Sequence, residues 1–160
     1  CIPVTIAVHV PTSEWLGLDR SHDALDVAHR NAVAHHVADR CTFQVSDVLD
    51  SIPFGRFDLV TMNPPYIPST EIAELEPEVK DHEPSFALTD GADGLTFYRR
   101  FAEVASDLLR PDGCAFLEIG YGQAPTVREL MEGAGHSCTI LDDLAGIPRI
   151  VRIEPSVTKS

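Results

Sequence analysis

Short apolar runs alternate with helix-like segments along this chain of 160 residues, and this alternation limits the folds that it can adopt. Strands are predicted at residues 14–19, 41–45, 57–62, 114–119, 136–141 and 147–154. Helices are predicted at residues 1–10, 21–35, 92–110 and 125–132. This pattern is typical of an α/β domain built on a doubly wound, largely parallel sheet. At this length we expect one domain over residues 1–154 and a tail at residues 155–160.

Local signals mark several boundaries of these elements. Ser21 is a suitable N-cap for the helix that follows it. Pro111-Asp112-Gly113 predicts the end of the helix at residues 92–110. Residues 70–89 are polar and acidic and contain two prolines, so they predict a loop that is long enough to have a function.

The most informative motif is Asn63-Pro64-Pro65-Tyr66, which directly follows the apolar run at residues 57–62. Neither proline can donate a backbone hydrogen bond, so the chain must leave the sheet at the carboxyl end of that strand. Ligands of open α/β sheets bind at this edge. Asn63 offers an amide, Pro64 a carbonyl acceptor and Tyr66 an aromatic face with a polar tip. They predict a planar slot for an amide or a nucleobase amine, and the alternative is a proline-rich turn.

The net charge of −13, from 12 basic and 25 acidic side chains, bears on the class of partner. An enzyme that binds duplex nucleic acid needs cationic charge opposite the phosphates, and here the longest basic cluster is Arg99-Arg100. The balance therefore favours a protein substrate. No apolar run approaches the ~20 residues that span a membrane, and no segment has the pattern of a signal peptide.

Cysteine and histidine spacings give no indication of a metal site. The four cysteines, Cys1, Cys41, Cys114 and Cys138, lie far apart without a Cys-x-x-Cys pair, so buried thiols of a cytosolic protein are predicted. The histidines have no partners at ligand spacing either, and we expect no bound metal.

The tetrapeptide at residues 63–66 resembles the substrate motif of methyltransferases that use S-adenosylmethionine and methylate an amide or exocyclic amine nitrogen. DNA adenine methyltransferases carry the same four residues. The next stretches are LEPEVKDHEPSFAL at residues 75–88 and DGADGLTFYRR at residues 90–100. With them the chain resembles the release-factor glutamine methyltransferases, which modify the glutamine of the Gly-Gly-Gln loop in peptide chain release factors. The resemblance covers residues 1–154.

That resemblance implies a Rossmann-like, class I methyltransferase fold in a cytoplasmic enzyme. Its mostly parallel sheet would have an antiparallel strand at the carboxyl end. It also implies a first strand, a Gly-rich loop and a small amino-terminal helical domain, which would all precede Cys1. The chain is therefore expected to be truncated at its amino end.

The cofactor-binding residues are expected at the ends of successive strands. Asp19 ends a strand, where a carboxylate can accept both ribose hydroxyls of S-adenosylmethionine, and the alternative is a turn or capping aspartate. By the resemblance, Asp47 would accept the adenine amine and Val48 would cover the ring. Asn63 would touch both cofactor and substrate.

The expected reaction is direct methyl transfer to the glutamine amide nitrogen. Asn63 and the Pro64 carbonyl would hold the two N–H groups and turn the nitrogen lone pair toward the methyl group. Pro65 and Tyr66 would complete the substrate slot. Glu83-Pro84, in the long acidic loop, would bind substrate and fold over the site.

Three other functions stay open. The glutamine methyltransferases of ribosomal proteins share the Asn-Pro-Pro-Tyr and His82-Glu83-Pro84 features, although residues 97–100 and 143–149 look more like the release-factor branch. A nucleic-acid adenine methyltransferase is disfavoured by the negative charge. A non-catalytic nucleotide-binding domain is the third. The sequence determines neither the particular release factor nor the oligomeric state.

Overall fold

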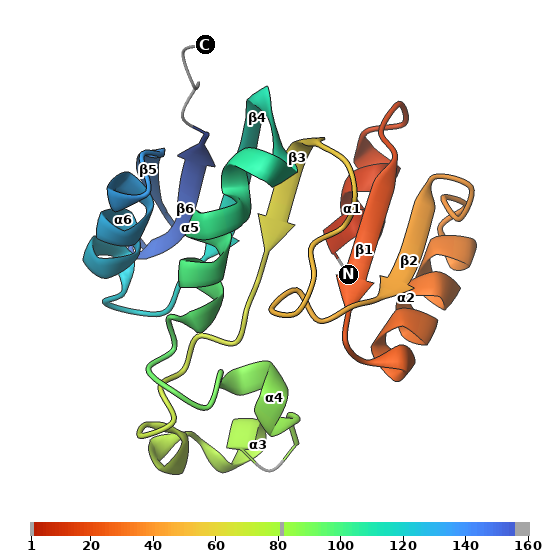
Figure 1. The fold of residues 1–160 in the computed structure, drawn as a ribbon. Helices are drawn as coiled ribbons and strands as arrows, with labels where there is room; N and C mark the ends of the chain where they lie inside the picture. The colour runs from red at the N-terminus through yellow and green to blue at the C-terminus, as the bar shows by residue number, and fades with distance from the viewer. Residues whose placement is uncertain (1, 81, 156–160) are drawn as a thin grey trace. The chain divides into compact units, whose positions relative to one another are not determined.

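A computed structural model describes residues 2–80 and 82–155, and Figure 1 gives the order of their helices and strands. The chain divides into two compact units, residues 1–52 and residues 53–160. Cys1, where the first predicted helix begins, and most of the predicted tail lie outside the described residues. The single domain over residues 1–154 stays a prediction.

The first unit contains a two-stranded parallel sheet and two helices. In chain order its elements are α1 (Ile2–His9), β1 (Trp15–Asp19), α2 (His22–Ala34) and β2 (Cys41–Val45). Strands β1 and β2 pair in register from Trp15 opposite Cys41 to Asp19 opposite Val45. Both strands therefore end at the same edge, because parallel strands run in one direction.

The α2 helix begins as the sequence predicts. The Ser21 hydroxyl accepts a hydrogen bond of 3.2 Å from the Ala24 backbone N–H, so it satisfies one of the free donors of the first turn. Helix and sheet meet in a small apolar core, whose buried members are Val4, Ala7, Ala32, Val37 and Cys41.

The second unit contains a four-stranded sheet in the order β3-β4-β6-β5. Its strands are β3 (Phe57–Met62), β4 (Leu109–Glu118), β5 (Ser137–Asp142) and β6 (Pro148–Glu154). The β3 and β4 strands are parallel, and β6 is antiparallel to both β4 and β5. The predicted antiparallel strand at the carboxyl end is thus confirmed. The described strands pair as two sheets, one in each unit.

Two long helices cover this second sheet. The α5 helix (Thr96–Leu108) packs against β4, and α6 (Ala124–Gly133) packs against β5 and β6. Their apolar faces form the core with the central strands, and its largest fully buried side chains are Tyr98, Leu109, Leu117, Ile119, Val127, Met131, Val151 and Ile153.

The boundary between α5 and β4 differs from the prediction. The helix begins at Thr96 instead of residue 92, because the Asp90 carboxylate accepts hydrogen bonds from three backbone N–H groups and folds residues 90–95 into a turn. It ends at Leu108, before Pro111-Asp112-Gly113. The predicted stop at that tripeptide was wrong, because Leu109 already pairs with Phe57 in the sheet. The tripeptide instead lies in β4, at a register shift.

The predicted long loop contains three short helical segments, η1 (Ile72–Glu74), α3 (Pro77–Lys80) and α4 (Ser85–Leu88), drawn in yellow-green and green in Figure 1.

Of the described cysteines, Cys41 is buried and the other two are half-buried. Burial raises the pKa of the Cys138 thiol to about 11. No helix among the described residues is long and apolar enough to cross a membrane. Within residues 2–80 and 82–155 no cluster of His, Cys, Asp or Glu has the make-up of a metal site.

Candidate active site

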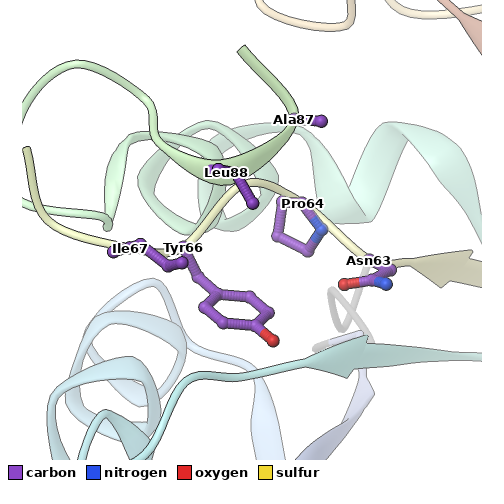
Figure 2. A pocket seen from close by; sticks show the side chains of 6 residues that line it. All are labelled: Asn63, Pro64, Tyr66, Ile67, Ala87 and Leu88. Atoms are coloured by element: carbon purple, nitrogen blue, oxygen red, sulfur yellow. The ribbon is translucent and has the colours of Figure 1, made fainter. Parts of the chain in front are cut away.

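The Asn-Pro-Pro-Tyr segment leaves the sheet where β3 ends, as predicted. Met62 is the last residue of β3, Asn63 is exposed and Pro64 is buried. A pocket of about 130 Å³ opens beside them, and Figure 2 shows the side chains that line it: Asn63, Pro64, Tyr66, Ile67, Ala87 and Leu88. Small-molecule sites usually measure ~300–1,000 Å³. This pocket therefore suits one side chain rather than a whole cofactor.

Tyr66 is fixed through its hydroxyl group. The hydroxyl donates a 3.2 Å hydrogen bond to Glu118 Oε1, at the end of β4. Burial raises the pKa of Tyr66, and the neighbouring Glu118 charge adds to that effect. The hydroxyl therefore stays protonated near neutral pH and points toward β4, while the ring lies beside the pocket (Figure 2).

Helix α5 is anchored to the same end of β4. Tyr98, which is fully buried, donates a 2.7 Å hydrogen bond to the Glu118 backbone oxygen. Burial raises the pKa of Tyr98, so this hydroxyl too remains a donor. Glu118 thus receives one hydrogen bond on its side chain and one on its backbone from two tyrosines.

Backbone contacts fasten the far end of the motif. The Gln123 Nε2 donates a 2.9 Å hydrogen bond to the Tyr66 carbonyl, and the next N–H, from Ile67, donates to Leu88 O at 3.0 Å. The sequence did not identify Gln123. A 3.2 Å hydrogen bond from the Gln123 backbone N–H to Gly120 O closes a turn just after β4.

The long acidic segment contributes an apolar wall to the pocket. Ala87 and Leu88 of α4 line it, whereas the predicted Glu83 and Pro84 are exposed and lie before the helix, with Pro84 at its N-cap. Neither of these two is among the lining residues, and neither is Pro65, which is half-buried. Their substrate-binding roles stay predictions.

Of the predicted cofactor residues, Asp19, Asp47 and Val48 lie in the first unit, at the carboxyl edge of β1 and β2, and Asn63 lies in the second unit. Asp19 Oδ1 accepts a 2.8 Å hydrogen bond from the Ser21 backbone, and its own backbone oxygen accepts one of 3.0 Å from Ser46. Asp47 Oδ1 accepts from the Leu49 backbone at 3.0 Å, in a turn that includes the half-buried Val48. Both carboxylates thus have a turn-forming role. In each, Oδ2 accepts no hydrogen bond from the described part of the chain.

Comparison with known proteins identifies the fold. The family model of the methyltransferase small domain matches residues 1–75. A solved methyltransferase structure from Pyrococcus furiosus superposes with a TM-score of 0.65 over 93% of this chain and 66% of that chain, at 17% identity. The fold is that of the class I, S-adenosylmethionine-dependent methyltransferases.

Sequence relatives give a more specific comparison. The release factor glutamine methyltransferase of Cereibacter sphaeroides is 43% identical over 94% of this chain, and that of Geobacter sulfurreducens is 38% identical, also over 94%. By sequence the chain is similar to release factor glutamine methyltransferases over nearly its whole length. It spans about half the length of these relatives, 54% and 53%.

Proposed function

We propose that the protein transfers a methyl group from S-adenosylmethionine to the side-chain amide nitrogen of the glutamine in the Gly-Gly-Gln loop of a peptide chain release factor. The observation that carries this proposal is the pocket of about 130 Å³ with Asn63 and Pro64 in its wall. Its size suits one side chain. The similarity to release factor glutamine methyltransferases supports the same reaction.

The Asn63 side-chain oxygen and the Pro64 carbonyl would accept hydrogen bonds from the two N–H groups of the substrate amide. An amide nitrogen is a poor nucleophile, because its lone pair is shared with the carbonyl group. Holding both N–H groups orients that lone pair and stabilises the positive charge that grows on nitrogen during transfer. Tyr66 would pack beside the substrate. Since its hydroxyl is bonded to Glu118, it acts in packing rather than as a base.

S-adenosylmethionine would be held by residues of the first unit. Asp19 and Asp47 each keep one carboxylate oxygen without a hydrogen bond from the described residues, which fits the hydroxyl and amine donors of the ribose and adenine. Val48 would cover the adenine ring. The cofactor supplies an electrophilic methyl group when bound, and the residues of this chain orient the amide that receives it.

The proposed substrate also implies where the protein acts and what it binds. Release factors work on ribosomes, so we expect a cytoplasmic enzyme with a protein partner. The net charge of −13 supports this, since contact with duplex phosphates requires cationic side chains.

The test is methyl transfer from labelled S-adenosylmethionine by the full-length protein. A release factor, ribosomes and duplex DNA are offered in separate reactions. We expect label on the release factor alone, on the peptide that contains Gly-Gly-Gln, and none on a factor whose glutamine is replaced by asparagine. Label on ribosomal protein or DNA would assign a different substrate class. Bound cofactor without transfer to any of the three would indicate a non-catalytic domain.

Asn63→Ala links the activity to the pocket. Loss of one preorganised acceptor typically costs ~10²–10³ in rate, so turnover should fall by that factor. The side chain is exposed, so the fold should persist. Asn31→Ala, on the exposed side of α2, is the matched control and should retain full turnover. Normal turnover of Asn63→Ala would refute the role of this residue.

A further inference from the structure

We propose that Gln123 is a positioning residue for methyl transfer, which holds the backbone of residues 63–66 in its reactive geometry. Gln123 need not touch the substrate or the cofactor for this role. It would act through Asn63 and Pro64, whose oxygen atoms depend on where the segment lies. The inference rests on the proposed function.

Both ends of the Gln123 carboxamide are engaged. Its Oε1 accepts a 2.9 Å hydrogen bond from the Gly120 backbone N–H, and its Nε2 donates a 2.9 Å hydrogen bond to the Tyr66 carbonyl. The carboxamide group is planar, so the bond from Gly120 also aims the N–H group at Tyr66. Gly120 follows β4 by two residues, and β4 pairs with β3. The side chain thus connects the neighbouring strand end to the slot.

The position of Gln123 indicates that this hydrogen bond has a purpose beyond helix formation. Gln123 occupies the N-cap of α6, yet its side chain makes no capping hydrogen bond to that helix. Instead it reaches a carbonyl 57 positions earlier in the chain. A side chain that capped α6 would accept a hydrogen bond from one of the free backbone N–H groups in the first turn of that helix.

Two glycines leave the room that this carboxamide needs. A Cβ atom on Gly94 would lie 3.0 Å from Gln123 Nε2, and a Cβ atom on Gly120 would lie 2.9 Å from Gln123 Oε1. Real Cβ contacts are rarely that close. The carboxamide is therefore enclosed from two sides, which restricts its orientation.

The Gln123 side chain acts on one peptide group. The Tyr66 carbonyl and the Ile67 N–H belong to the same planar unit, and they bond to Gln123 and to Leu88 respectively. This unit is held at both polar atoms. The two prolines before Tyr66 have φ fixed by their rings. Few backbone torsions are then free to rotate between the end of β3 and the held peptide group. If the Gln123 hydrogen bond is removed, the resulting displacement of this peptide group therefore also moves Asn63.

Gln123→Glu in the full-length protein gives the sharpest test. The carboxylate can still accept from Gly120, but it cannot donate to the Tyr66 carbonyl. We expect kcat for the release factor to fall about 10-fold to 100-fold, because small displacements of positioning groups have effects of that order. The affinity for S-adenosylmethionine should fall less than kcat does, since of the predicted cofactor-binding residues only Asn63 depends on the Gln123 hydrogen bond, whereas Asp19, Asp47 and Val48 do not.

A pH series supplies a readout that a merely structural role would not change. A half-buried carboxyl group that faces a carbonyl oxygen takes up a proton well above its usual pKa of about 4.3, and it then donates as the amide does. The ratio of variant to native kcat should therefore recover as the pH falls from about 8 to about 5.5. Gln123→Ala, which has no donor at any pH, should show a flat ratio.

The outcomes separate the two proposals. Glu129→Gln, on the exposed side of α6, is the control and should leave kcat unchanged. If the native protein methylates the release factor and the Gln123→Glu variant has the native kcat at pH 8, this inference is overturned and the proposed function is not. The same holds if the ratio does not recover at low pH. A native protein that fails to methylate the release factor overturns the proposed function instead.

Discussion

Gly94→Ala should destabilise the second unit through the backbone of the substrate slot. Gly94 is buried with φ +77°, in the turn that precedes α5. A Cβ atom there would overlap the Tyr66 carbonyl oxygen and lie 2.9 Å from the Tyr66 carbonyl carbon. Both are backbone atoms held by neighbouring hydrogen bonds, so they cannot move aside as the end of a flexible side chain would.

Two costs add in this substitution. A left-handed backbone costs a non-glycine residue about 1–2 kcal/mol. Forcing an extra methyl group into a packed site costs a further ~1–3 kcal/mol. Gly91→Ala separates the two, because Gly91 lies in the same turn with φ +76°, is exposed, and has no heavy atom within 4 Å of a built Cβ. In both variants, replacing glycine by alanine also lowers the conformational entropy of the unfolded chain. This effect therefore cancels when the stabilities of the two variants are compared.

Hydrogen exchange of the β3 and β4 amides measures the result, because it reports on the second unit. We expect Gly94→Ala to lower the free energy of opening by ~1–3 kcal/mol more than Gly91→Ala. Methyl transfer should fall in Gly94→Ala and not in Gly91→Ala, since only the former displaces Tyr66. Equal decreases in stability in the two variants would refute the reasoning that Gly94 is required by close approach to Tyr66.

Other perturbations test separate parts of the structure. The hydrogen bond from Arg99 lowers the pKa of Asp93 from 3.8 to about 2. The ionised Asp93 carboxylate therefore contributes stability above about pH 4, and this contribution is lost as the pH falls toward 2. In the Asp93→Asn variant the urea midpoint should depend less on pH across that range. Ser21→Ala removes the α2 cap and should speed amide exchange in its first turn, at a cost of ~0.5–2 kcal/mol. Asp19→Ala should weaken S-adenosylmethionine binding by ~1.5–3 kcal/mol in calorimetry, and unchanged affinity would leave Asp19 as a turn residue only. Asp26→Ala, exposed on α2, is its control.

The exit of the chain at Asn63 was predictable because its cause is local. Two adjacent prolines cannot continue a ladder, and no distant contact can restore their missing N–H groups. The Ser21 cap is equally local, as are the ends of β5 and β6, which fall within one residue of the prediction. Such features follow from residues that are neighbours in the sequence.

The features that the sequence did not predict depend on distant partners. The start of β4 is set by the pairing of Leu109 with Phe57, 52 positions earlier. The start of α5 is a local exception, because it is set by the Asp90 carboxylate, which helical periodicity does not take into account. Helical periodicity alone therefore extended the helix at both ends. Gln123 was missed for the same reason, since nothing near it in the sequence indicates a bond to Tyr66. The signal present was its place just after a strand end, where ligand sites of α/β sheets lie.

The geometry also explains why the Asn-Pro-Pro-Tyr tetrapeptide does not select a substrate by itself. In the proposed mechanism, Asn63 and Pro64 would present acceptors to any group with two N–H donors, whether it is a side-chain amide or a nucleobase amine. Selection then depends on the rest of the pocket, which is walled by Ala87 and Leu88 of α4. Small and aliphatic side chains there suit the methylene stem of a glutamine, with its amide at Asn63. Those wall residues lie in the stretch at residues 75–88 that resembles the release-factor enzymes. The resemblance and the pocket therefore support the same proposed substrate. The tetrapeptide would orient the nitrogen atom, and α4 would limit the kind of side chain that carries it.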